Sequence, residues 1–228
     1  MGNLIEYAAL NEYADNRDVI SLFSGAMGLD IGLKKAGLNV VIGQDFDESC
    51  VKTMQANGHN VLGGDIREIN PRKLLELTGL SAGEPFLICG GPPCQPFSTA
   101  GKRLGINDPR GSLFMDFIRM IDYIRPRFFV MENVKGIMSA PLKHVPLSER
   151  DENDPDQRLG TVLDVILSEF DKLGYKTVYG VLDAVNYGVP QFRERFVLIG
   201  SRDNESIFLP IPTHFQMHQD KAYQWKTV

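Results

Sequence analysis

The sequence predicts an α/β fold in which a doubly wound, mostly parallel sheet carries helices on both faces. Short apolar runs of strand length alternate with segments of helical character from about residue 17 onward. Glycine-rich turns follow several of these runs, and the unusual polar residues also come just after them. Strands that alternate with helices are typical of parallel sheets, and such sheets bind ligands beyond the carboxyl ends of their strands.

The first strand, turn and helix are the most clearly marked. Residues 18–23 form a short apolar run, and Gly25 and Gly28 mark the turn that follows it. Residues 29–36 are predicted to be helical, and Gly37 stops this helix because glycine is the commonest residue just past a helix end.

The remaining elements repeat this alternation through most of the chain. The other strands are predicted at 40–42, 61–62, 86–89, 128–131, 176–182 and 195–201. The other helices are predicted at 47–57, 71–78, 112–124 and 159–173. A long Gly/Pro-rich loop, 90–111, follows the fourth strand.

These elements divide the chain into three predicted parts. An N-terminal extension covers 1–17, a catalytic domain covers 18–202, and 203–228 has the Pro-containing composition of a linker toward a further domain. Residues 139–158 are rich in Pro, Asp, Glu and Arg without periodicity, which indicates a surface insertion in the catalytic domain.

Composition narrows the class of protein. The 228 residues are 43% apolar and 23% charged, with no apolar run long enough to span a bilayer and no signal peptide, so an intracellular, cytoplasmic protein is expected. Three cysteines and four scattered histidines support neither a disulfide framework nor a metal site. The net charge of −5 argues weakly against a free-standing nucleic-acid binder.

The turn at 23–28 is a candidate ligand site. Glycines between a strand and a helix let backbone N–H groups approach a ligand, and Asp45 follows the second strand where a carboxylate would grip ribose hydroxyls. An ordinary tight turn is an equally good interpretation. The full dinucleotide-binding fingerprint is absent, which disfavours NAD and an oxidoreductase.

The loop after the fourth strand is more informative. Prolines stand on both sides of Cys94 and restrict its backbone, so the thiol is held at the carboxyl edge of the sheet, as nucleophilic catalysis requires. A buried structural cysteine is the alternative. Cys89, inside an apolar strand, fits that alternative, whereas Cys94, in a polar loop, does not.

Two further segments bring charge to the same edge. Glu132 ends an apolar strand, and because the fourth and fifth strands end side by side, it should lie near Cys94 and could share a proton with a substrate nitrogen. An exposed glutamate is the alternative. Period-two alternation would place Gln191, Arg193 and Arg195 on one face, suited to an anionic or carbonyl-bearing substrate, to a clamp on Glu132, or to plain solvation.

Taken together and in this order, Pro92-Pro93-Cys94-Gln95, Glu132-Asn133-Val134 and Gln191-x-Arg193-x-Arg195 resemble the DNA (cytosine-5) methyltransferase family. The resemblance extends from about Val19 to Arg202. It implies a class I S-adenosylmethionine-dependent methyltransferase fold and S-adenosylmethionine as methyl donor, with S-adenosylhomocysteine as product and no metal.

The resemblance also assigns residues to the methyl donor. Asp45 is similar to the ribose-binding acid, Phe46 to the aromatic ring that stacks on adenine, and Asp65 with Ile66 to the pair that reads the adenine edge. The remaining implied cofactor residues lie in the first turn or before Cys94, and they are Phe23, Ser24, Gly25, Gly28, Leu29 and Pro92.

On the substrate side, Cys94 resembles the nucleophile that adds to carbon 6 of a flipped-out cytosine. Glu132 resembles the acid that engages ring N3, and Arg195, with Arg193, the arginines that hold the base and this glutamate. Gly101 to Gly111 would belong to a loop that closes over duplex DNA. The implied DNA-contacting residues are Gln95, Ser98, Lys102, Arg103 and Gln191.

Two features depart from the family pattern. Met27 stands where the family has glycine, and its side chain could crowd the cofactor. The chain also ends where the family continues into a target-recognition domain and two further segments. We therefore expect a subunit of a split enzyme, which needs a second polypeptide, or a truncated form, and we expect weak or no methylation by this chain alone.

Three other functions explain parts of the sequence. A tRNA cytosine-5 methyltransferase would share the active site, so the sequence does not exclude it. An inactive, methyltransferase-like assembly subunit is disfavoured because Cys94, Glu132, Arg193 and Arg195 are all present. An NAD-dependent oxidoreductase leaves the Cys94 loop unexplained. The favoured setting is a restriction-modification or other DNA-modification system.

Overall fold

The computed structural model describes residues 17–93, 113–143, 145, 149–151 and 153–227. Hydrogen bonds link seven strands in the order β3-β2-β1-β4-β5-β7-β6. The chain divides into two compact units. The first contains residues up to Gly91 together with Asp116–Phe129, and the second contains the remainder, so that β5 contributes residues to both.

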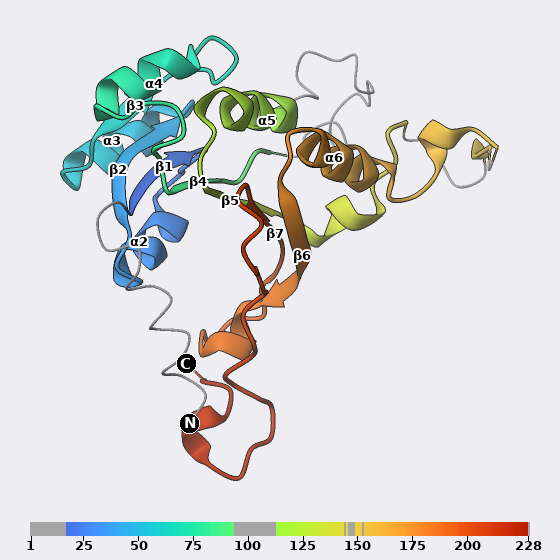
Figure 1. Ribbon diagram of the computed structural model, residues 1–228. Coiled ribbons are helices and arrows are strands. Elements are labelled where there is room, and N and C mark those ends of the chain that lie inside the picture. The colour runs from blue at the N-terminus through green and yellow to red at the C-terminus, as the bar shows by residue number, and fades with distance from the viewer. Residues whose placement is uncertain (1–16, 94–112, 144, 146–148, 152, 228) are drawn as a thin grey trace. The chain divides into compact units, whose positions relative to one another are not determined.

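The strands and helices of the first unit follow the predicted alternation (Figure 1). They are β1 (Asp18–Leu22), α2 (Gly28–Lys35), β2 (Asn39–Asp45), α3 (Glu48–Ala56), β3 (Val61–Gly63), α4 (Pro71–Thr78) and β4 (Leu87–Gly90). Most of α5 (Leu113–Ile124) and the first two residues of β5 (Phe128–Asn133) also belong to this unit. Strand β1 pairs in parallel with β2 and with β4, and β2 pairs in parallel with β3. The predicted doubly wound α/β fold is confirmed.

Local sequence explains where the helices of this unit begin and end. The Asp47 carboxylate accepts hydrogen bonds from the N–H groups of Ser49 and Cys50 and so caps α3. Asn70 caps α4 in the same way, and Pro71 occupies its first position, where no N–H is needed. Gly79, in the left-handed region, ends α4.

The interior of the first unit is formed by strands β1 and β4 and helix α5. Val19, Ile20 and Ile88 are fully buried, and Phe117 of α5 packs edge-on against Phe129 with ring centroids 6.5 Å apart. Gly90 lies so close to β1 that a Cβ there would come within 2.5 Å of the Leu22 carbonyl oxygen, so only glycine fits.

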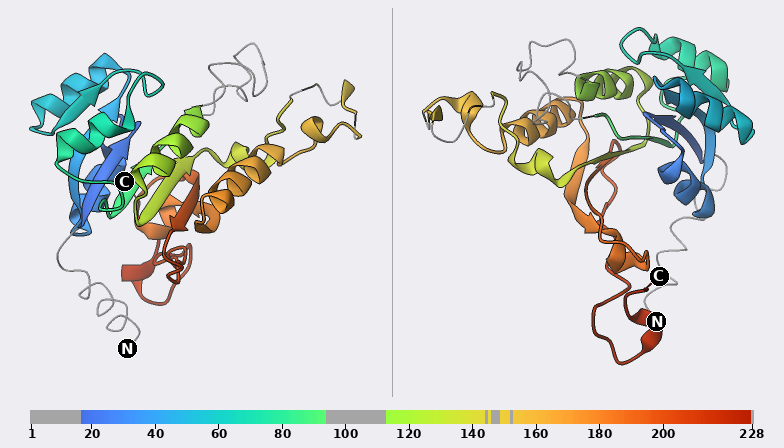
Figure 2. Two further views of the ribbon diagram at one scale, coloured as in Figure 1. Left: turned by 45° about the horizontal axis from the view of Figure 1, so that its top comes forward. Right: turned by 180° about the vertical axis from the view of Figure 1, so that it is seen from behind.

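The second unit is built on an antiparallel pair of strands, β6 (Lys176–Asp183) and β7 (Glu194–Ser201). Helix α6 (Thr161–Lys172) lies beside β6 (Figure 2), and Val162, Ile166 and Phe170 of this helix are fully buried. Short 3-10 helices connect these elements, namely η2 (Lys135–Ser139), η4 (Pro155–Gln157), η5 (Ala184–Tyr187) and η6 (Lys221–Tyr223).

The segment 139–158, predicted to be a surface insertion, is partly packed against the rest of the second unit. Gln157 is buried, and its side chain accepts a hydrogen bond from the Asp151 N–H at 2.9 Å. The Thr161 hydroxyl accepts from the Leu142 N–H at 2.9 Å, which ties this segment to the start of α6.

The final segment, 203–227, is anchored on Asn186. The Asn186 carbonyl accepts hydrogen bonds from the N–H groups of Thr213 and His214, both at 2.9 Å. The Trp225 indole N–H donates to the Asn186 side-chain oxygen at 3.1 Å. In the part of the chain that the structure describes, no helix is long and apolar enough to cross a membrane.

Candidate active site

The turn between β1 and α2 has an unusual backbone. Phe23, Gly25 and Met27 all have positive φ, at 54°, 55° and 62°. Left-handed conformations cost non-glycine residues about 1–2 kcal/mol, so this turn requires support from its surroundings. Part of that support is the Gly25 N–H, which donates to the Asp45 carboxylate at 2.7 Å.

Ser24 fixes the turn from inside. Its hydroxyl donates to the Ser21 hydroxyl at 2.8 Å and accepts from the Gln44 N–H at 3.2 Å. Its own N–H donates to the Gln44 carbonyl at 2.9 Å. Within the proposed cofactor loop, the Ser24 hydroxyl therefore shapes the backbone.

Met27 is the residue that was expected to crowd the cofactor. Its side chain is only 3% exposed, so it fills the interior beneath the turn. It also occupies the N-cap position of α2 with left-handed backbone and makes no side-chain capping bond. The left-handed backbone at position 27 favours glycine, whereas the buried space beneath the turn favours a large apolar side chain such as methionine. These two requirements conflict at this residue.

Asp45 and Phe46 lie at the end of β2. Besides Gly25, the Asp45 carboxylate accepts a hydrogen bond from the Asp47 N–H at 2.8 Å. An ionised carboxylate offers about four acceptor positions, so two remain for ligand hydroxyls. The Phe46 ring is 73% exposed, so its face is accessible for stacking on another ring.

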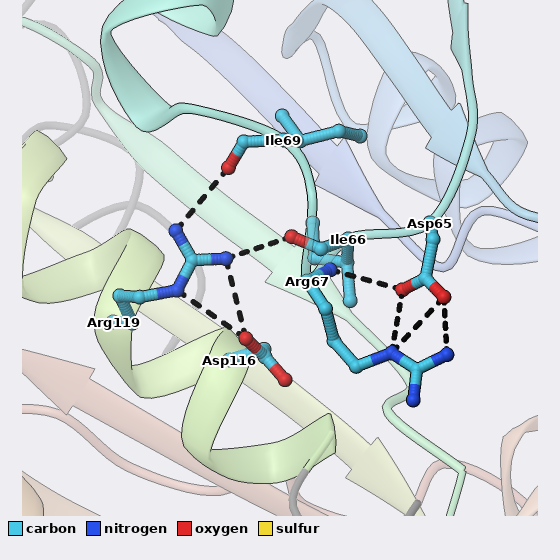
Figure 3. A network of polar contacts seen from close by, with 6 residues as sticks. All are labelled: Asp65, Ile66, Arg67, Ile69, Asp116 and Arg119. Carbon is cyan, nitrogen blue, oxygen red and sulfur yellow. Dashed lines mark hydrogen bonds and ion pairs between the residues drawn. The ribbon is translucent and has the colours of Figure 1, made fainter. Parts of the chain in front are cut away.

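The turn after β3 contains Asp65 and Ile66, the pair expected to read adenine (Figure 3). The Arg67 guanidinium binds both carboxylate oxygens of Asp65, and the Arg67 N–H donates to the same carboxylate at 3.0 Å. These hydrogen bonds from Arg67 hold the pKa of Asp65 below its usual value.

Arg119 of α5 binds this turn from the other side. Its guanidinium donates to the Ile66 carbonyl at 2.7 Å and to the Ile69 carbonyl at 3.2 Å. Asp116, one turn earlier on α5, pairs with the same guanidinium at 3.2 Å. The sequence gives little sign of these contacts, because about 50 residues separate Arg119 from the turn.

A buried carboxyl group lies beneath the first turn. Asp30 of α2 is fully buried, and neither oxygen has a hydrogen-bond partner among the residues that the structure describes. Desolvation raises the pKa of Asp30, against a smaller opposing effect of the nearby Ser21 hydroxyl, which falls short of hydrogen-bond geometry. Cys89 is buried too, as its apolar strand predicts, and burial with the charge of Asp30 raises its pKa to about 12.

The second unit holds the residues expected to act on the substrate. Glu132 lies within β5, and its carboxylate oxygen is 2.7 Å from Arg195 Nε of β7. Both side chains are partly exposed, at 36% and 28%. Of the interpretations that the sequence leaves for Arg195, the structure therefore shows the ion pair with Glu132. Arg195 also donates from Nη1 to the Glu194 carbonyl at 2.8 Å.

Asn133, the next residue of β5, binds the segment that leads to Cys94. Its side-chain amide donates to the Pro92 carbonyl at 2.9 Å in a buried setting. Its side-chain oxygen accepts from the Val134 N–H at 2.8 Å. The residue after Glu132 therefore lies against a residue two positions before Cys94.

One part of the predicted arrangement is wrong. Gln191 and Arg193 precede β7, which begins at Glu194, so they do not share a strand face with Arg195. The Arg193 N–H donates to the Asp183 carboxylate at 2.8 Å, and its carbonyl accepts from the Ala184 N–H. These bonds hold Arg193 in a connection, and both Gln191 and Arg193 are exposed.

Five of the predicted site residues lie outside the described residues, and they are Cys94, Gln95, Ser98, Lys102 and Arg103. The predicted DNA-closing loop from Gly101 to Gly111 also falls there. Within the described parts of the chain, no group of three or more His, Cys, Asp or Glu side chains could hold a metal ion.

Comparison with known proteins defines the class of protein. The sequence pattern of the family described as C-5 cytosine-specific DNA methylase matches residues 17–228. The chain belongs to this family. Its sheet and helices are those of the class I S-adenosylmethionine-dependent methyltransferases.

Individual relatives are the type II methyltransferases M.AquIA of Picosynechococcus sp., 38% identical, and M.FnuDI of Fusobacterium nucleatum, 37% identical. The matches cover 89% and 83% of this chain, and 79% and 48% of those proteins. With several further relatives, the chain spans about half of their length.

Solved structures agree with this assignment. A putative DNA modification methyltransferase from an E. coli prophage superposes with a TM-score of 0.62 at 26% identity, over 82% of this chain and 47% of that one. A DNMT2 variant of Spodoptera frugiperda superposes with a TM-score of 0.60 at 25% identity, over 83% of this chain and 51% of that one.

Proposed function

We propose that this chain carries the methyl-donor site and the catalytic residues of a DNA (cytosine-5) methyltransferase that acts through a covalent Cys94 adduct. The observation that carries this function is the Glu132–Arg195 ion pair, next to the Asn133 bond that holds the segment before Cys94. The relatives named type II methyltransferases favour a restriction-modification setting.

The residues of the first unit fit S-adenosylmethionine, which supplies an electrophilic methyl group on a sulfonium centre. The turn 23–28, with Gly25 and Gly28, would lie around the methionine part, and Leu29 follows it in α2. Asp45 has acceptor positions left for ribose hydroxyls, and the exposed Phe46 ring offers a stacking face for adenine. Asp65 and Ile66 would read the adenine edge, and Pro92 is proposed as a further cofactor residue.

The chemistry assigned to the second unit overcomes the weak nucleophilicity of cytosine carbon 5. The Cys94 thiolate adds to carbon 6, while Glu132 gives a proton toward N3, so that electron density moves to carbon 5. Carbon 5 then attacks the methyl group, and the donor leaves as S-adenosylhomocysteine. Loss of the carbon-5 proton to solvent, elimination of the Cys94 thiolate and return of the N3 proton to Glu132 restore the aromatic ring. Because stacked duplex hides carbon 6, the base must be extruded.

Arg195 has two tasks in this mechanism. Its guanidinium orients the Glu132 carboxyl through the 2.7 Å contact, and it offers further N–H donors to the cytosine carbonyl oxygen. Arg193, exposed before β7, is proposed to hold the base together with Arg195. The proposed DNA contacts are Gln191, Gln95, Ser98, Lys102 and Arg103.

Covalent trapping tests this mechanism. The chain, alone and together with a C-terminal chain of a family relative, is incubated with S-adenosylmethionine and duplex DNA that contains 5-fluorocytosine, and the adduct is measured on denaturing gels. Fluorine cannot leave as a proton does, so active Cys94 should remain bound to the DNA, and Cys94→Ser should not. Equal trapping by Cys94→Ser would show that the nucleophile is assigned wrongly. A parallel reaction with 5-fluorocytosine tRNA distinguishes the DNA substrate from the tRNA alternative.

The proposed assembly includes a second polypeptide that carries a target-recognition domain. The net charge of −5 supports this, since binding to DNA phosphates requires basic residues that would be supplied elsewhere. Trapping and methyl transfer should therefore rise when a C-terminal chain of a family relative is added. Full turnover by the purified chain alone would rule this partner out.

A further inference from the structure

The turn from Gly64 to Ile69 is held in shape by hydrogen bonds from several directions. The Gln44 side chain donates to the Gly64 carbonyl at 2.7 Å. Within the turn, the Glu68 N–H donates to the Asp65 carbonyl at 3.0 Å. The Ile66 side chain is buried, so its backbone cannot rotate without exposing apolar surface.

Arg119 supplies two bonds to this turn that come from outside it. Nη2 donates to the Ile66 carbonyl and Nη1 to the Ile69 carbonyl, so that one planar guanidinium spans a stretch of four residues (Figure 3). The fork of Arg can donate in two fixed directions at once, and the ammonium of Lys cannot.

Asp116 fixes the orientation of this fork. Its carboxylate oxygen Oδ1 accepts from Arg119 Nε at 3.3 Å and from Nη2 at 3.2 Å. The Asp116 side chain is only 14% exposed, which limits competition from water. All three guanidinium nitrogens of Arg119 are therefore engaged, and the side chain has a defined direction.

We propose that Arg119, oriented by Asp116, is a positioning residue for recognition of the adenine base. By holding the Ile66 and Ile69 carbonyls, it fixes the backbone of the turn that carries the Ile66 N–H and the Asp65 carboxylate. This role rests on the proposed function, which places adenine at Asp65 and Ile66. It deepens that function, because it makes base selectivity depend on a residue of α5 that does not touch the ligand.

The chemistry of adenine explains why direction matters. A ring nitrogen of adenine is an acceptor that suits the Ile66 N–H. Its amino group is a donor that suits the Asp65 carboxylate, which would exchange a bond to the partly exposed Arg67 side chain for one to the base. Hypoxanthine has a carbonyl oxygen and a protonated ring nitrogen at these positions, so both contacts would be mismatched. A site with both groups fixed should therefore reject the inosine analogue strongly.

The test measures binding of S-adenosylhomocysteine and S-inosylhomocysteine by calorimetry. The unmodified chain should prefer the adenosine ligand by a factor of about 100 or more. Arg119→Gln should weaken adenosine binding about tenfold or more while the inosine ligand changes little, so the preference collapses. The preference of Arg119→Lys for the adenosine ligand should lie between those of the unmodified chain and Arg119→Gln. Asp116→Asn should lose part of the preference because Arg119 remains but is less well oriented.

A matched control is Arg72→Gln, which removes an exposed Arg–Glu pair on α4. This variant should keep the full preference. If Arg119→Gln weakens both ligands by the same factor, Arg119 has only a structural role and the inference is wrong. If Arg119→Gln does not fold, an unchanged preference in Asp116→Asn and Arg119→Lys overturns the inference equally.

The two proposals fail in different ways. If the unmodified chain binds neither ligand, the proposed methyl-donor site is wrong. If it binds S-adenosylhomocysteine selectively and the Arg119 and Asp116 variants keep that selectivity, the site stands and only the positioning role fails.

Discussion

Arg195 Nε lies 2.7 Å from the Glu132 carboxylate, which joins strand β7 to strand β5 through a charged contact. A guanidinium that both neutralises and orients a carboxyl group is geometrically specific, and lysine cannot reproduce it. Arg195→Lys should therefore reduce covalent trapping of 5-fluorocytosine DNA by about 10-fold, and Arg195→Ala by about 100-fold or more.

The control for this prediction is Lys135→Ala. Lys135 pairs with Glu194 at 2.9 Å, also at the start of β7, but both side chains are about half exposed. Exposed pairs contribute little, so trapping should change by less than about threefold. Equal losses in the Lys135 and Arg195 variants would mean that general disturbance of β7 explains both.

Asn133→Ala should disturb the segment before Cys94. Removal of the amide leaves the buried Pro92 carbonyl without its donor, which should lower the free energy of unfolding by about 1–3 kcal/mol. Trapping should slow as well, because Pro92 lies two residues before Cys94, the proposed nucleophile. Asn60→Ala, which removes an exposed bond to the Val41 carbonyl, should change neither quantity appreciably. If Asn133→Ala traps the DNA at the normal rate, the Asn133–Pro92 contact does not contribute to catalysis.

Asp30 should make stability depend on pH in an unusual direction. Because its pKa is raised in the folded state, the folded protein binds the proton more tightly than the unfolded chain does. This contribution to stability is fully present below the unfolded pKa of about 3.9 and is lost as the pH rises through the raised folded value. Asp30→Asn should therefore increase the free energy of unfolding at neutral pH, because the amide carries no charge to desolvate.

Urea denaturation at several pH values measures this effect, and the gain of Asp30→Asn should shrink as the pH falls. The control is Asp164→Asn, which also lies in the first turn of a helix but is exposed. It should change stability by less than about 0.5 kcal/mol at any of these pH values. An Asp30→Asn protein that is less stable than the unmodified chain at neutral pH would contradict this prediction.

Met27 allows a test of its backbone conformation. Glycine is favoured over alanine at an N-cap, and the left-handed backbone of Met27 strengthens this preference because Cβ meets the following carbonyl. Met27→Gly should therefore be more stable than Met27→Ala by about 1 kcal/mol in urea denaturation, although both lose the buried side chain. The reverse order would show that position 27 has relaxed out of the left-handed region.

Much of the fold could be predicted from the sequence because local signals agree with one another. The range 71–78 was predicted without error, since Asn70, Pro71 and Gly79 mark both ends of α4. Strand β7 was placed within one residue of its start. The alternation predicted across Gln191 and Arg193 was wrong, because the Asp183 carboxylate binds the Arg193 N–H and holds it outside the ladder.

The sequence predicts which residues form the proposed site, but it does not predict all of their contacts. Asp45 was expected to meet a ribose, and its bond to the Gly25 N–H was not foreseen. The Arg119 contacts with Ile66 and Ile69 depend on how α5 packs, which neither periodicity nor a motif encodes. An unpaired buried Asp30 also could not be expected, since a polar residue in the first turn of a helix is ordinarily solvated.

The bond from the Gly25 N–H to Asp45 bears on how a ligand would arrive. It joins the first turn to the end of β2 through groups of the protein itself, so the loop is ordered during folding and not during association. Binding to such a preorganised site reduces the conformational entropy of the ligand but changes that of the polypeptide little. The entropic cost of binding should therefore be small, and association should be fast.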